Sequence, residues 1–117
     1  MELQLFDHPR LEASLGDDPQ ALCELVDAFV RIQPARLQHL RAVMRRRDFA
    51  EARRMAHQLV GSFRSMEMPS LAQAAERLEL AAEQGDVLIS AASLRQVRRL
   101  FVATLDAVHD QLRERRP

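Results

Sequence analysis

Apolar residues recur three and four positions apart along most of the chain, the pattern of helices that bury one face in a core. The pattern predicts one short helix and four long ones. The short helix spans residues 7–15, and the long helices begin near Pro19, Phe49, Pro69 and Ser90. No segment alternates apolar and polar residues as a half-buried strand would. Because the connections are short, consecutive helices are expected to be antiparallel. We therefore expect an all-α fold, an up-down-up-down four-helix bundle with a short N-terminal cap helix.

Residues that start, bend and stop helices mark the same elements. Asp18 and Asp48 stand where an N-cap is expected, just before an apolar helical pattern begins. Pro34 lies inside the second helix and is expected to kink it near residues 30–33 without dividing it, because the apolar stripe continues across the proline. Gly85 closes the fourth helix as a C-terminal glycine.

Size, composition and charge exclude several classes of protein. A chain of 117 residues is expected to form a single domain, residues 1–117, and a monomer, because four long helices can bury their own stripes. All 17 basic residues are arginine and are balanced by 17 acidic ones, which argues against nucleic-acid or membrane binding by the whole chain. Cys23 is the only cysteine, so no intramolecular disulfide forms, and we expect it to be buried. The chain shows neither a signal-peptide pattern nor a membrane-spanning stretch, so a cytoplasmic location is expected.

One titratable side chain stands beside the apolar stripe of the third long helix. The stripe consists of Ala52, Met55, Ala56, Leu59, Phe63 and Met66. His57 lies just off it, on a second face with Arg53, Arg54, Val60, Gly61 and Arg64. A lone histidine beside a stripe is more often structural. Gly61, however, lies one turn beyond His57, where a helix-interior glycine costs about 1 kcal/mol relative to alanine. The simplest explanation is that the His57 ring must stay open to a partner.

Positive charge gathers around this histidine. Between Arg41 and Arg64 the chain has seven arginines and two acidic residues, although the protein as a whole is neutral. Guanidinium groups hold phosphoryl oxygens through charge-assisted hydrogen bonds. The surroundings of His57 therefore suit a phosphohistidine.

The run from Ala56 to Glu79 resembles the signature of histidine-containing phosphotransfer (HPt) domains. In that family a His-x-Leu-Lys-Gly core is followed by a leucine and then by a Leu-Glu pair. The matching positions here are His57, Leu59, Gly61, Leu71, Leu78 and Glu79. The preceding helix, including Pro34, is also similar, so the resemblance covers nearly the whole chain.

The resemblance implies that His57 accepts a phosphoryl group on its outward-pointing Nε2, from a receiver-domain aspartate or a sensor kinase. It then passes the group to another receiver aspartate. The protein would be a carrier without its own ATP site, not an enzyme, and would bind no cofactor. Gly61 would leave room for the receiver's loops. Glu79 would stand near His57, where it could orient the ring or simply be solvated. The implied partners are a response-regulator receiver domain and a hybrid sensor histidine kinase.

The sequence departs from the family pattern at two positions. Val60 replaces the lysine that neutralises phosphate and contacts the receiver, and Glu67 replaces a second glycine at the helix end. We expect Arg64 or Arg53 to supply the missing charge, since both lie on the histidine face.

Two other interpretations are weaker. An HPt-like module could dock onto a kinase or receiver without carrying phosphate, but the presence of both His57 and Gly61 favours the carrier. A di-iron bundle needs Glu-x-x-His on two helices. The nearest pattern is the single pair Asp106-x-x-His109, so no metal site is expected.

Overall fold

The computed structural model describes residues 4–116, and in this part of the chain the regular structure consists of five helices. These are α1 (His8–Ser14), α2 (Pro19–Arg45), α3 (Phe49–Ser65), α4 (Pro69–Glu83) and α5 (Val87–Leu112). Residues 4–116 contain no strand, so the prediction of an all-α fold is confirmed. None of these helices is long and apolar enough to cross a bilayer.

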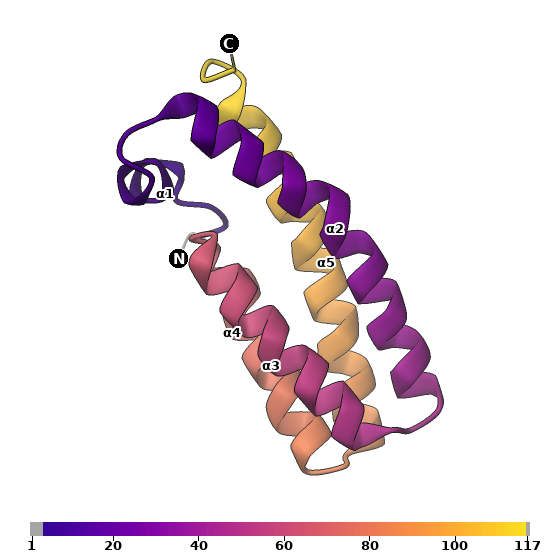
Figure 1. Ribbon diagram of the computed structural model, residues 1–117. Coiled ribbons are helices and arrows are strands. Elements are labelled where there is room, and N and C mark those ends of the chain that lie inside the picture. Colours follow the sequence, from indigo (N-terminus) through magenta and orange to yellow (C-terminus); the bar gives the residue numbers. More distant parts are fainter. Residues whose placement is uncertain (1–3, 117) are drawn as a thin grey trace.

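The four long helices lie along one another as an elongated bundle (Figure 1). In this view α3 lies in front of α4, while α5 lies behind α2. The α2–α3 and α4–α5 connections are at the lower end of the bundle. The α3–α4 connection lies part of the way up, on the side of α1, and α2 and α5 extend beyond it. A helical bundle with a short N-terminal helix at one end is therefore present, as predicted.

Phenylalanine side chains join three of the long helices at the centre of the core. The ring of Phe29 on α2 lies 6.0 Å from Phe63 on α3 and 6.0 Å from Phe101 on α5, measured between ring centroids. The predicted apolar stripe of α3 is buried along its whole length. These contacts fix the rotation of α3 about its axis, and with it the direction in which the opposite face points.

Aspartate side chains cap the long helices where the sequence places them. The carboxylate of Asp18 accepts from the amides of α2, and that of Asp48 accepts from Glu51 N, as predicted. Asp86 caps α5, so this helix begins at Val87, three residues before the predicted start near Ser90. Residues 87–89 are exposed apolar residues that fit no core-facing stripe, and the pattern alone therefore misplaced this end. α2 runs unbroken through Pro34, as predicted, while the kink there stays a prediction.

Glu67 occupies a left-handed backbone conformation, with φ of 58°, directly after the last turn of α3. The amide of Met68 donates to Phe63 O, and that of Glu67 donates to Arg64 O, each at 3.0 Å, which is the double bond of a Schellman ending. A glycine adopts this conformation without strain, which explains why the family pattern has a glycine at this position. Here the carbonyl of Glu67 also accepts from Asp7 N at 2.9 Å and so ties the N-terminal segment to the α3–α4 turn.

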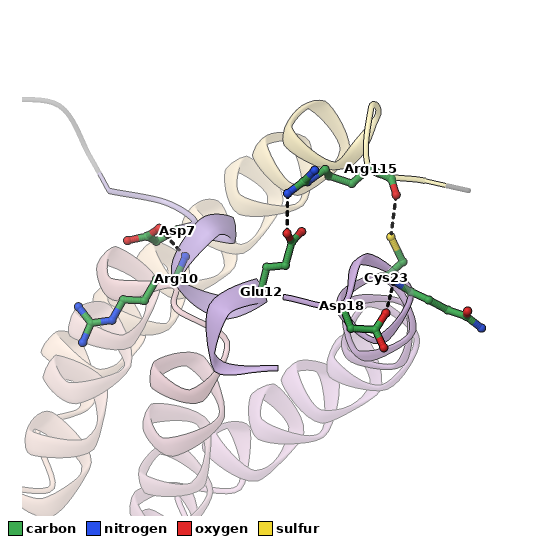
Figure 2. A network of polar contacts seen from close by, with 7 residues as sticks. Asp7, Arg10, Glu12, Asp18, Cys23 and Arg115 are labelled. Carbon is green, nitrogen blue, oxygen red and sulfur yellow. Dashed lines mark hydrogen bonds and ion pairs between the residues drawn. The ribbon is translucent and has the colours of Figure 1, made fainter. Parts of the chain in front are cut away.

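α1 is fastened to the end of the bundle by apolar and charged contacts. Leu11 of α1 is buried in the core, and Glu12 is buried against the guanidinium of Arg115. Figure 2 shows Glu12 pointing to this arginine, whose carbonyl oxygen lies 3.9 Å from the thiol of Cys23. Cys23 is buried and free, as predicted. The contacts hold the chain after α5 against the start of α2.

Candidate functional site

His57 is an exposed titratable side chain on α3. Its side chain is 73% exposed, yet its Nδ1 lies 3.0 Å from Oε2 of Glu79, whose own side chain is 21% exposed. Glu79 belongs to α4, and 22 positions separate the two residues along the chain. The packing of α3 on α4 therefore brings together an exposed imidazole and a largely covered carboxylate.

This hydrogen bond determines which ring nitrogen of His57 can react. A carboxylate only accepts hydrogen bonds, so Nδ1 must carry a proton and act as the hydrogen-bond donor to Glu79. In the neutral ring, Nε2 is then left with a free lone pair. Because Nδ1 is engaged and the ring is otherwise exposed, Nε2 is the nucleophilic atom available to a partner.

Gly61 lies one turn beyond His57 on the exposed side of α3. A Cβ placed there would meet no described atom within 4 Å outside its chain neighbours and its own helix backbone. Nothing inside the described part of the protein therefore requires a glycine. The helical penalty of about 1 kcal/mol has no internal compensation, which is consistent with a requirement for access from outside.

Beside Gly61, an open groove of about 510 Å³ runs between α2 and α3. Leu25 and Ile32 of α2 line it and are exposed, although both are large apolar residues. Ser62 and Ser65 of α3 line the other side. The groove gives the histidine face an apolar border suited to contact with another protein.

The three arginines near His57 have different surroundings. Arg64 forms an ion pair with Glu76 of α4, and Arg54 donates from Nε to Glu51 at 2.9 Å. The hydrogen bond from Arg54 lowers the pKa of the Glu51 carboxyl. Arg53 is exposed and makes no ion pair with any residue in 4–116. Helical side chains lean toward the N-terminus, so Arg64 leans toward Gly61 and His57, whereas Arg53 leans away.

Val60 does not lie on the exposed face, and its placement beside His57 in the sequence analysis is wrong. Only 5% of its surface is exposed, and it belongs to the core cluster. The position is four residues after buried Ala56 and three before buried Phe63, so it falls within the stripe. A lysine here could reach the surface only by extending its chain out of the core, and valine does not reach it.

The described residues do not form a metal site. No group of three histidine, cysteine, aspartate or glutamate side chains within residues 4–116 is placed to hold a metal ion. The pair Asp106 and His109 is exposed on α5 and gains no further ligand within that range.

The fold and this site define a helical bundle that presents one oriented, accessible imidazole on its surface. Comparison with known protein families matches residues 24–115 to the Hpt domain, and the chain belongs to this family. The family transfers phosphoryl groups on histidine in phosphorelay signalling. Searches of curated proteins and of solved structures found no match. The matched range contains His57, Gly61, Arg64 and Glu79, while α1 precedes it.

Removing the Glu79 carboxylate should change the tautomer of His57. At mildly alkaline pH, long-range 1H–15N spectra of the imidazole should show a protonated Nδ1 and an unprotonated Nε2. In Glu79→Ala the ring should shift toward a tautomer mixture, because the acceptor at Nδ1 is lost. Glu83→Ala, an exposed residue one turn further along α4, is the matched control. A wild-type ring protonated at Nε2 would contradict the assignment.

Proposed function

We propose that this protein is a phosphorelay intermediate in which His57 carries the phosphoryl group. The group comes from the phospho-aspartate of a receiver domain or from a hybrid sensor histidine kinase, and goes to the aspartate of another receiver domain. Residues 1–117 act as one domain, an up-down-up-down four-helix bundle capped by α1, and the carrier is a monomer. The observation that carries the proposal is the exposed His57 ring, with Nδ1 bonded to Glu79 and Nε2 free.

This geometry supports the following transfer step. The Nε2 lone pair of His57 attacks phosphorus, an N–P bond forms, and the P–O bond to the donor aspartate breaks, returning a carboxylate. The proton on Nδ1 stays in place, so the phosphorylated ring is cationic. The Glu79 carboxylate, 3.0 Å from Nδ1, stabilises that charge. The second receiver reverses the step, and kinase activity lies in a partner with its own ATP site.

Gly61 gives the receiver access to Nε2. A receiver aspartate must approach the ring closely, and the bare backbone at Gly61 admits the loops that carry it. The exposed apolar residues Leu25 and Ile32 border the same approach and bury against the partner on docking.

Arg64 takes the place of the missing lysine. It leans toward His57, and its ion pair with Glu76 is exposed, so it exchanges at little cost for a doubly charged phosphoryl group. Arg53 remains the second candidate because it has no competing carboxylate among the described residues.

Incubation with a phosphorylated receiver domain and its kinase should place an acid-labile, alkali-stable label on this protein. His57→Gln should abolish the label, whereas His39→Gln and His109→Gln, which remove other exposed histidines, should retain it. ATP without the kinase should give no label. Absence of label with every receiver tested would contradict the carrier and favour a docking module that binds a kinase or receiver without phosphate.

Gly61→Ala should separate stability from transfer. The alanine meets open space and is the better helix former, so the free energy of unfolding should rise by about 1 kcal/mol, measured from urea midpoints at constant slope. Phosphotransfer should fall about tenfold, which corresponds to about 1.4 kcal/mol in the barrier. A more stable variant that transfers at the wild-type rate would rule out the access role.

Arg64→Ala should slow transfer about tenfold, because the phosphoryl group loses the cation that leans toward it. Arg53→Ala should have a smaller effect, since its side chain leans away from His57. Glu76→Gln, which releases Arg64 from its ion pair, should leave the rate unchanged or raise it. Single-turnover rates from a phosphorylated receiver measure all three, and a larger loss in Arg53→Ala would reverse the assignment.

A further inference from the structure

Two adjoining grooves lie between α2 and α5, away from the histidine site. The first, of about 320 Å³, is lined at one end by Phe49 and Val87, and the second, of about 440 Å³, by Pro34 and Val102. Arg41 of α2 and Arg98 of α5 line both. None of His57, Glu79, Gly61 and Arg64 lines either groove. We call this continuous surface the α2–α5 groove.

Positive charge along the α2–α5 groove has no counterpart in the described residues. Five exposed arginines line it, namely Arg41, Arg45, Arg95, Arg98 and Arg99. None of the five makes an ion pair within residues 4–116, and no described acidic residue lines the groove. The nearest acids along the chain are Asp48, Asp86 and Asp106. The carboxylates of Asp48 and Asp86 already accept from first-turn amides, and Asp106, exposed on α5, makes no ion pair with any of the five arginines. Like charges held together without neutralisation repel one another, so a bound anion would relieve the repulsion.

The floor of the groove is apolar. Leu37 and Phe101 lie beneath the second part, and Leu94 and Met44 beneath the first. Val102 is exposed at the far end. Ser90 also lies in the first part, fully buried, with a hydroxyl that has no hydrogen-bond partner in the described chain. An apolar floor with a cationic rim fits a ligand that is itself apolar on one side and anionic along its flanks.

The shape of the groove favours a helix as that ligand. Val87 and Val102 mark its two ends, and 15 helical residues span about 22 Å. A helix of the same length would lay its apolar face between α2 and α5 and hold carboxylates opposite the guanidinium groups. A flat lipid surface would not reach the floor. Single-stranded nucleic acid needs a series of exposed aromatic rings to stack on. The groove has two phenylalanines, of which Phe101 is buried and Phe49 is partly buried.

We propose that the α2–α5 groove binds an acidic amphipathic helix of a partner protein. Recognition combines burial of the partner's apolar face on Leu37, Leu94 and Val102 with carboxylate contacts to the five arginines. It is separate from phosphotransfer at His57, because the two sites share none of the residues named for either.

The test uses a fluorescein-labelled helical peptide of about 15 residues with leucines on one face and glutamates on both flanks. Its anisotropy should show binding to the full chain, and binding should weaken as salt rises. Arg41→Glu combined with Arg98→Glu should lower the affinity at least about tenfold. Arg31→Glu combined with Arg77→Glu makes the same change in net charge at exposed arginines outside the groove. This control should change the peptide affinity by no more than about twofold. Circular dichroism should show that both variants remain helical.

Other outcomes would overturn the proposal. These are absence of peptide binding, equal binding of a peptide with glutamine in place of glutamate, and equal losses in the two charge-reversal variants. Preferential binding of phosphatidylserine vesicles or an oligonucleotide would assign the groove to another class of ligand. His57→Gln should bind the peptide as well as the wild type, so failure of phosphotransfer and failure of the groove are distinguishable.

Discussion

The packing of α3 against α4 is the contact on which both the fold and the histidine site depend. Small side chains are frequent in these two helices, because α4 buries five alanines and α3 buries Ala52 and Ala56. The distance between packed helices follows the size of the side chains between them. Larger residues where α3 and α4 meet would separate the two helices, and the carboxylate of Glu79 would no longer lie 3.0 Å from Nδ1 of His57. The site is thus a consequence of the close packing of two helices that both bury alanines.

The hydrogen bond between His57 and Glu79 contributes orientation more than stability. An exposed charged or polar pair adds only about 0–1 kcal/mol to folding, and the His57 side chain is 73% exposed. The hydrogen bond fixes Nδ1 as the protonated nitrogen of the neutral ring, while the rest of the ring stays exposed. A pair carried on two helices whose opposite faces are buried holds its geometry better than a pair on loops. The bundle therefore supplies rigidity, and the exposed face of α3 supplies access.

Local patterns in the sequence predicted the helices. Among contacts between distant segments, the sequence analysis expected that of Glu79 with His57, and only from the family resemblance. Short segments alone determine the apolar stripe on α3, the N-caps at Asp18 and Asp48, and the position of Gly61 one turn beyond His57. The burial of Val60 was also readable, because it lies four residues after Ala56. A face centred on His57 takes in Val60 as well, but the apolar stripe of α3 is wide enough to bury it. The ion pair of Arg64 with Glu76 required the register of α3 against α4, which periodicity does not give.

The sequence pattern also does not show which charges meet in the fold. A net charge of zero therefore does not mean that every part of the surface is neutral. The formal charge of zero argued against polyelectrolyte partners for the whole chain, and the sequence pointed to a cationic site only near His57. Folding divides these arginines into two sets. Arg54, Arg64 and Arg115 meet carboxylates, while Arg41 and Arg98, 57 positions apart in the sequence, converge without one. Net charge governs long-range attraction, but recognition at contact distance depends on which charges remain unneutralised after folding. A chain that is neutral overall can therefore offer a phosphoryl group one cationic site and an acidic partner another, on separate faces of one small bundle.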